Sequence, residues 1–142
     1  MRVFDASAVL AFIFDEPGGD KAERLLTDST AAISAVNLDE VVARLVEQGF
    51  TEADVDAICA GLRIEVLPLT AAGAIASGKL RVSTRALGLP LGDRCCLALA
   101  LEHGAKGLPL SVHPVVTARP RSRRTHQLSS TRAAACRRRP SP

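Results

Sequence analysis

Three carboxylates stand where a folded α/β chain would bring them together. Asp5 follows a short β-prone run, Glu40 lies early in a strongly amphipathic stretch, and Asp93 opens a later helical stretch. Ligands of open α/β sheets bind beyond the carboxyl ends of the parallel strands. We therefore expect the three acids to converge at one edge of a sheet.

Acids held together repel one another unless a divalent cation neutralises them. Ligation by carboxylate oxygens alone suits Mg²⁺ or Mn²⁺, which keep bound waters and leave positions for a phosphate oxygen and a nucleophile. The pattern thus favours metal-assisted phosphodiester hydrolysis. Simpler interpretations stay open, because Asp5 and Asp93 could be helix N-caps. Glu40 could be an exposed acid that the dipole of its helix favours.

Motifs of rival chemistries are absent from the sequence. It has no glycine-rich nucleotide-binding loop, no H-E-x-x-H and no G-x-S-x-G. Two of its three histidines, His113 and His126, lie in the last 30 residues, which disfavours a histidine-based zinc site. Adjacent Cys95 and Cys96 lack zinc-ligand spacing, so we interpret the cysteines as buried free thiols. Because Trp and Tyr are absent, so are the aromatic platforms of single-strand binders.

Short strands and longer helices must position the acids. Strands are predicted at 1–4, 31–34 and 64–67, with a possible last strand at 108–112. Helices are predicted at 7–14, 20–26, 34–48, from 51 onward, at 70–87 with an interruption at Gly78, and from Asp93 onward. The helix at 34–48 has an apolar stripe of Leu38, Val41, Val42, Leu45 and Val46, which we expect to be buried, with Glu40 on the flank beside Asn37 and Arg44. The last helix is expected to bury Cys96, Leu97, Ala100 and Leu101.

Charge divides the chain into two parts. Through Ala105 there are 9 Lys and Arg against 15 Asp and Glu, a net charge of −6, whereas the remainder carries 9 Lys and Arg and no acid. The sequence after residue 112 has no hydrophobic period, so we predict one domain at 1–112 and a disordered basic tail at 113–142. No apolar run approaches the ~20 residues of a membrane span, and no signal segment is recognisable. We expect a cytoplasmic protein with no membrane partner.

Three segments resemble the successive acidic motifs of PIN-domain ribonucleases, specifically the VapC-type toxins of bacterial toxin-antitoxin pairs. They are Val3–Ser7, Ser34–Val41 and Leu89–Ala100, and the resemblance covers about residues 1–105. It implies an α/β fold, a three-layer α/β/α sandwich with a short parallel sheet. It also implies an endoribonuclease that depends on Mg²⁺ or Mn²⁺, cuts RNA, forms a homodimer and is inhibited by a VapB-type antitoxin.

The resemblance also assigns roles to individual residues. Asp5, Glu40 and Asp93 would be the catalytic metal ligands. Ser7 would be a supporting hydroxyl near Asp5, and Asn37 would support Glu40 from one helical turn earlier.

The sequence departs from this family after residue 105. The family's fourth acid has no counterpart, because no Asp or Glu follows Glu102, and the elements that close the sheet are not recognisable. The change to a basic, Arg- and Pro-rich composition suggests a frameshift, with a selected RNA-binding basic arm as its rival. Three functions therefore stay open: a ribonuclease, intact or impaired; an inactive toxin-like module that binds an antitoxin or RNA; and a degenerate gene product.

Overall fold

Three short parallel strands and six α-helices make up the described part of the chain. The computed structural model describes residues 1–28 and 30–104, so the predicted strand at 108–112 and tail at 113–142 lie outside the described residues. The strands are β1 (Arg2–Phe4), β2 (Ala31–Ser34) and β3 (Glu65–Leu67). The helices are α1 (Ala6–Phe14), α2 (Gly19–Asp28), α3 (Ala35–Glu47), α4 (Glu52–Gly61), α5 (Ala71–Ser83) and α6 (Leu91–Glu102), with a 3₁₀ turn η1 (Arg85–Leu87) before α6.

The sheet has the order β1-β2-β3 and all its strands are parallel. Phe4 pairs with Ile33, and Ile33 with Val66. This register brings the carboxyl ends of β1 and β2 side by side, about 5 Å apart across the sheet. Asp5 and Ser34, the residues at these two strand ends, are thereby neighbours.

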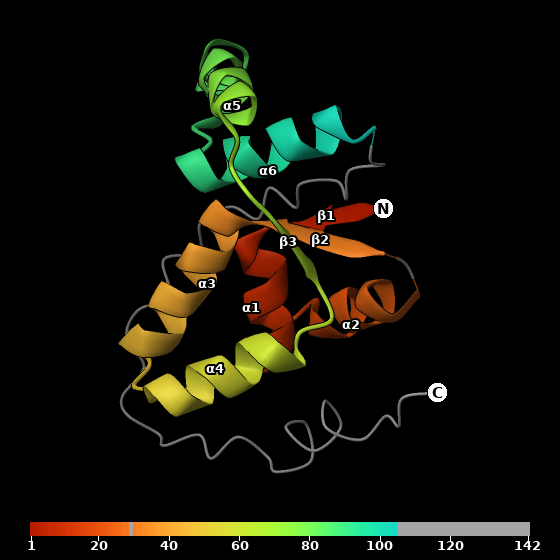
Figure 1. Cartoon of the computed structure of the whole chain (residues 1–142), viewed down its shortest axis with the longest axis vertical. Helices are drawn as coiled ribbons and strands as arrows, with labels where there is room; N and C mark the ends of the chain where they lie inside the picture. Colours follow the sequence, from red (N-terminus) through yellow and green to blue (C-terminus); the bar gives the residue numbers. More distant parts are fainter. Residues whose placement is uncertain (29, 105–142) are drawn as a thin grey trace.

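Helices cover both faces of the sheet. Figure 1 shows α5 and α6 on one side and α1, α2, α3 and α4 on the other. Successive strand side chains alternate between faces, so Phe4 joins the larger core with the first helices, whereas Val3 packs with Leu99 of α6. The predicted three-layer α/β/α sandwich is confirmed.

Most element boundaries agree with the sequence pattern. The predicted interruption of α5 and one predicted buried residue in each of α3 and α6 were wrong. Helix α5 runs unbroken through Gly78, since an interior glycine costs only about 1 kcal/mol, and it ends where the Thr84 hydroxyl bonds to the Leu80 carbonyl. Val46 was expected in the core but is 57% exposed, because it lies about 80° around α3 from Leu38.

The third error concerns the buried face of α6. Leu101 was expected inside but is 65% exposed. Instead Cys95, Ala98 and Leu99 are buried with Cys96 and Ala100, because α6 lies between the sheet and α5 and is covered on two sides. Within 1–28 and 30–104, no helix has both the length and the apolar character that crossing a membrane requires.

Candidate functional site

Asp5 connects β1 to α1 and caps the helix. Its Oδ1 accepts a hydrogen bond from the Ala8 backbone N–H at 2.8 Å and another from the Ser7 hydroxyl at 3.1 Å. The N-cap interpretation of Asp5 is therefore correct. Capping does not prevent Asp5 from binding a ligand, because both hydrogen bonds are to Oδ1. These bonds hold the carboxylate at the sheet edge.

Helix α3 starts at the neighbouring strand end and carries Asn37 and Glu40 on its first two turns. Ser34 caps it, accepting from the Asn37 backbone N–H at 3.1 Å, and the Ser34 hydroxyl donates to Asn37 Oδ1. Asn37 is fully buried, although the sequence pattern placed it on the flank of the helix beside Glu40. Its Nδ2 is a buried donor with no acceptor in the described part of the chain.

The start of α6 lies directly against these two residues of α3. A Cβ built on Gly92 would be 2.9 Å from Glu40 Oε2 and 3.1 Å from Asn37 Nδ2. A glycine at this position thus lets the two helices approach closely. Asp93 follows in the first turn of α6, whose N-cap is Pro90, so the N-cap interpretation of Asp93 was wrong.

The electrostatics show that the three acids act on one another. Burial, and then the charges of Asp93 and Asp5, raise the pKa of Glu40. Burial, and then the charge of Asp5, raise the pKa of Asp93. The fold therefore brings Asp5, Glu40 and Asp93 into one region of concentrated, partly desolvated negative charge.

Cys96 of α6 lies near the same acids but remains a neutral thiol. Burial, followed by the charges of Asp5, Asp93 and Cys95, raises its pKa to about 12. A protonated thiol is a poor metal ligand, since the thiolate is the binding form. The donors that the site offers at neutral pH are therefore oxygen atoms. The prediction of buried free thiols is confirmed for Cys95 and Cys96, whereas Cys59 is free but only half-buried. Cys136 lies outside the described residues.

An oxygen-only set of three carboxylates fits a hard divalent cation in its chemistry. Such a cation would offset both the burial and the repulsion between the acids that raise the pKa values of Glu40 and Asp93. In 1–28 and 30–104, no three Asp, Glu, His or Cys side chains are grouped closely enough to form a metal cluster. Binding would therefore require these carboxylates to draw closer together.

Sequence reasoning missed two residues that shape the site, Gly92 and Arg94. Arg94 is only 7% exposed, and its Nη1 donates to the Leu89 carbonyl at 2.6 Å, which fixes the loop before α6. Its Nε has no acceptor among the described residues. The signal was present in the sequence, since Arg94 is a charged residue directly before the apolar run 95–101.

Comparisons with known proteins agree with this fold. A family model described as PIN domain matches residues 2–118. A solved structure, a toxin-antitoxin complex from Klebsiella pneumoniae, has a similar fold with a TM-score of 0.59 and 21% sequence identity. The similarity covers 75% of this chain and 83% of that one. Comparison with curated proteins gives no match. Because the family model matches most of its length, this chain belongs to the PIN domain family.

Proposed function

We propose that this protein is a metal-dependent endoribonuclease and the toxin of a VapBC-type toxin-antitoxin pair. The observation that carries the proposal is the charge effect of Asp5 and Asp93 on Glu40 and of Asp5 on Asp93, which adds to burial in raising the pKa values of Glu40 and Asp93. Membership of the PIN domain family supports it, because such domains are generally metal-dependent nucleases. The fold of the Klebsiella pneumoniae toxin-antitoxin complex supports the assignment as a toxin.

Asp5, Glu40 and Asp93 would hold Mg²⁺ or Mn²⁺. When bound, such a cation supplies positive charge beside the phosphate and lowers the pKa of a coordinated water. Ser7 and the Ala8 N–H orient the Asp5 carboxylate through their hydrogen bonds to Oδ1. Gly92 leaves room for the Glu40 side chain.

Backbone N–H groups of the chain itself would bind the phosphate oxygens. Asn37 Nδ2 lies near the start of α6 but is buried, so it is not one of these donors. Pro90 has no side-chain capping bond, so α6 begins with backbone N–H groups that no capping side chain accepts. N–H groups at a helix start are suited to phosphate oxygens. Together they would stabilise the charge that develops on the phosphate during attack.

Attack by water in line with the leaving oxygen has a defined product. When the bond from phosphorus to O3′ breaks, it leaves a 5′-phosphate and a 3′-hydroxyl, whereas attack by the ribose 2′-hydroxyl breaks the bond to O5′ and leaves a cyclic phosphate. End-group analysis of cleaved RNA distinguishes the two. Cyclic-phosphate ends would contradict this mechanism.

The direct test is RNA cleavage by the purified protein with Mg²⁺ or Mn²⁺ and with a chelator. We expect cleavage that stops on chelation and in Asp5→Asn, Glu40→Gln and Asp93→Asn. Asp39→Asn is the matched control, because Asp39 precedes Glu40 on α3, is exposed and carries the same charge. Cleavage that persists in all three site variants would refute the proposal.

An inactive module that binds an antitoxin or RNA is the second candidate. It is favoured by the absence of any Asp or Glu after Glu102, where the family has a fourth acid. The two candidates differ in cleavage but share the antitoxin. Co-expression with any small protein encoded beside this gene tests for that partner. The mass of the isolated protein in solution tests the predicted homodimer.

A further inference from the structure

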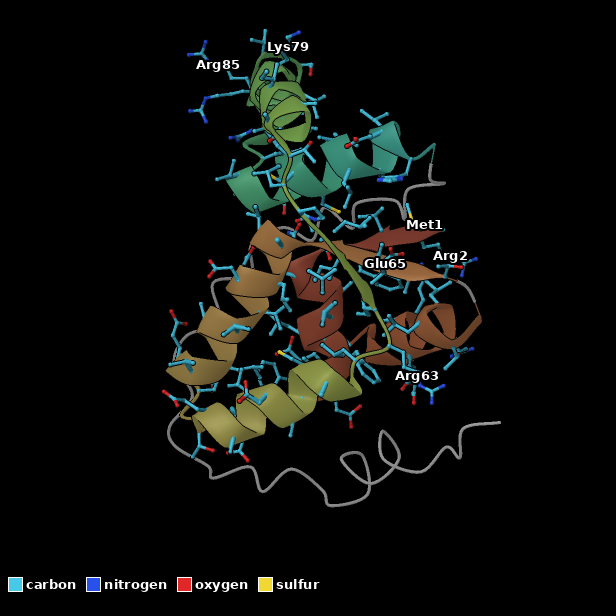
Figure 2. The ribbon with its side chains drawn as sticks, viewed as in Figure 1. Met1, Arg2, Arg63, Glu65, Lys79 and Arg85 are labelled. Carbon is cyan, nitrogen blue, oxygen red and sulfur yellow. The ribbon has the colours of Figure 1, made fainter. Side chains whose placement is uncertain are left out.

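A cationic segment interrupts the acidic body of this protein. No Asp or Glu occurs between Glu65 and Asp93, and this stretch contains Lys79, Arg81 and Arg85. The chain through Ala105 has a net charge of −6, whereas residues 66–92 carry a net charge of +3, all of it on α5 and η1. Figure 2 shows Lys79 and Arg85 together at one end of the molecule.

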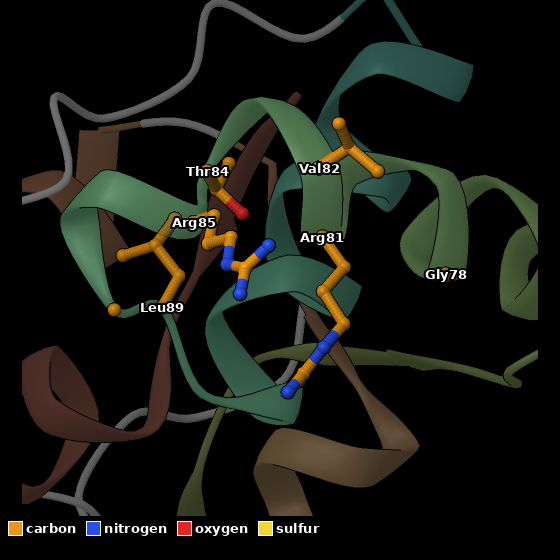
Figure 3. Close-up of a pocket in the computed structure, with 7 residues that line it drawn as sticks. Gly78, Arg81, Val82, Thr84, Arg85 and Leu89 are labelled. Atoms are coloured by element: carbon orange, nitrogen blue, oxygen red, sulfur yellow. The ribbon is translucent and has the colours of Figure 1, made fainter.

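Arg81 and Arg85 line a pocket of about 510 Å³ at this end. The pocket lies between the last turns of α5, η1 and the loop that leads to α6, with Thr84 and Leu89 also in its wall. Figure 3 shows the side chains of Arg81 and Arg85 extending to the same side of α5, whereas Val82 points away from them. We refer to it as the Arg81–Arg85 pocket.

Neither guanidinium group is neutralised by a side chain in the described part of the chain. Both arginines are exposed, and neither forms a hydrogen bond or ion pair with any residue in 1–28 and 30–104. Like charges four residues apart weakly repel, so the two guanidinium groups do not stabilise each other. Paired, unneutralised guanidinium groups that share a concave surface are instead suited to bind an anion with oxygen acceptors.

The pocket and the acidic site are joined by one short loop. Leu89 lines the pocket, and its carbonyl is held by the buried Arg94 side chain at 2.6 Å. Asp93 lies four residues later, which places its Cα at most ~14 Å from that of Leu89. A stacked nucleic-acid strand with a rise of ~3.4 Å per nucleotide spans this distance in about four nucleotides.

We propose that the Arg81–Arg85 pocket binds a backbone phosphate of the RNA strand, a few nucleotides from the bond that is cut. The proposal rests on the proposed nuclease function and adds a substrate contact to it. An RNA strand at Asp5, Glu40 and Asp93 meets concentrated negative charge, which repels its neighbouring phosphates. Cations beside the site offset this repulsion and fix the path of the strand.

The test compares the variant Arg81→Gln/Arg85→Gln with the wild type. Binding of a labelled single-stranded RNA of about 12 nucleotides is measured in the Asp5→Asn background, so that no cleavage intervenes. We expect the additional double substitution to weaken binding about tenfold or more at low salt. The slope of log affinity against log salt concentration should fall in magnitude by about 0.7, the value for one lost phosphate contact on a single strand.

A matched control is Arg63→Gln, which removes an exposed arginine in the loop between α4 and β3, far from Arg85 in Figure 2. It should leave RNA affinity close to that of the background protein. Equal loss in the Arg63 variant would overturn the proposal, because the effect would then be that of general charge. The variant Arg81→Lys/Arg85→Lys keeps the charge but loses the paired donors, and we expect intermediate affinity.

Two further outcomes separate this proposal from its alternatives. An unchanged RNA affinity with lost binding of a glutamate-rich peptide would overturn it in favour of a protein partner. In the cleavage assay, the Arg81→Gln/Arg85→Gln variant should lose about tenfold more activity on the 12-nucleotide RNA than on a dinucleotide, which is too short to reach the pocket. If the wild type cleaves neither substrate with metal, the nuclease function itself fails, whereas the binding test still decides on the pocket.

Discussion

Gly92 of α6 lies so close to Glu40 of α3 that a side chain does not fit between them. A Cβ on Gly92 would be 2.9 Å from Glu40 Oε2, a separation that real Cβ atoms essentially never show. The same Cβ would be 3.1 Å from Asn37 Nδ2. The absent side chain therefore leaves the two functional groups of α3 directed at the first turn of α6, where Asp93 lies.

Gly92→Ala should therefore impair the site more than the fold. The added methyl displaces the Glu40 carboxylate from the start of α6, so we expect at least a tenfold loss of Mn²⁺ affinity and of RNA cleavage, as for loss of a supporting residue. Calorimetric Mn²⁺ titration and cleavage rates measure this. If Gly92→Ala binds Mn²⁺ with the affinity of the wild type, the position of the Glu40 carboxylate beside α6 is not required for metal binding.

Stability separates this effect from unfolding. An alanine replacing an interior helical glycine typically stabilises by about 0.5–1 kcal/mol. Gly78→Ala in α5 should show this gain, because a Cβ there meets nothing within 4 Å. Gly92→Ala should show less, since the contact with Glu40 opposes the gain. A clear gain in both variants would contradict the steric argument.

Substitutions of Asp5 should separate its capping role from its charge. Asp5→Asn keeps an oxygen that can accept the Ala8 N–H, whereas Asp5→Ala removes it. We expect Asp5→Ala to lose about 1 kcal/mol of unfolding free energy and Asp5→Asn to lose little, while both lose cleavage. Denaturant unfolding alongside the cleavage assay provides the comparison. If Asp5→Ala and Asp5→Asn destabilise the protein equally, loss of the helix cap is not the cause.

Neutralising either of the other acids should stabilise the metal-free protein. The pKa values of Glu40 and Asp93 are raised, so their charged forms destabilise the fold at neutral pH. Glu40→Gln or Asp93→Asn should therefore raise the unfolding free energy in a chelator by about 0.2–1 kcal/mol, the range for solvent-screened charge pairs. The gain should vanish when saturating Mg²⁺ or Mn²⁺ is added, because the wild type is then stabilised by the ion.

The sign of the pH dependence follows from the same shifts. In the metal-free wild type, the contribution of these two acids to stability rises as pH falls through their raised pKa values. It levels off below their ordinary values of 4.5 and 3.8. The double variant Glu40→Gln/Asp93→Asn should lack this increment in unfolding experiments between pH 7 and pH 4. An identical pH profile in both proteins would contradict the charge coupling.

Activity should be low for a nuclease of this class. No Asp or Glu follows Glu102, so the fourth acid of the family pattern has no counterpart that could hold the metal or its water. Loss of one such partner typically reduces metal affinity or activity by about 10- to 100-fold. A Mn²⁺ titration of RNA cleavage checks this. Full activity at micromolar Mn²⁺ would show that three acids suffice.

Local sequence was enough to predict the elements and the three acids. Asp5 follows a strand and bonds to Ala8 three residues away, and Ser34 caps α3 through Asn37. Such interactions join residues close in the chain, so composition and spacing reveal them. The periodicity of α3 likewise predicted that Val41 and Leu45 are buried, because residues three or four apart lie on the same face of a helix.

The tertiary structure alone decided which groups meet. The contact of Gly92 with Glu40 and Asn37 joins α3 to α6, which are more than 40 residues apart in sequence. The burial of Asn37, the arginine that holds Leu89 and the Arg81–Arg85 pocket also depend on how α6 packs between α5 and the sheet. Periodicity shows which side of a helix is apolar, but not which helix covers it, because packing is settled by the shapes of distant surfaces.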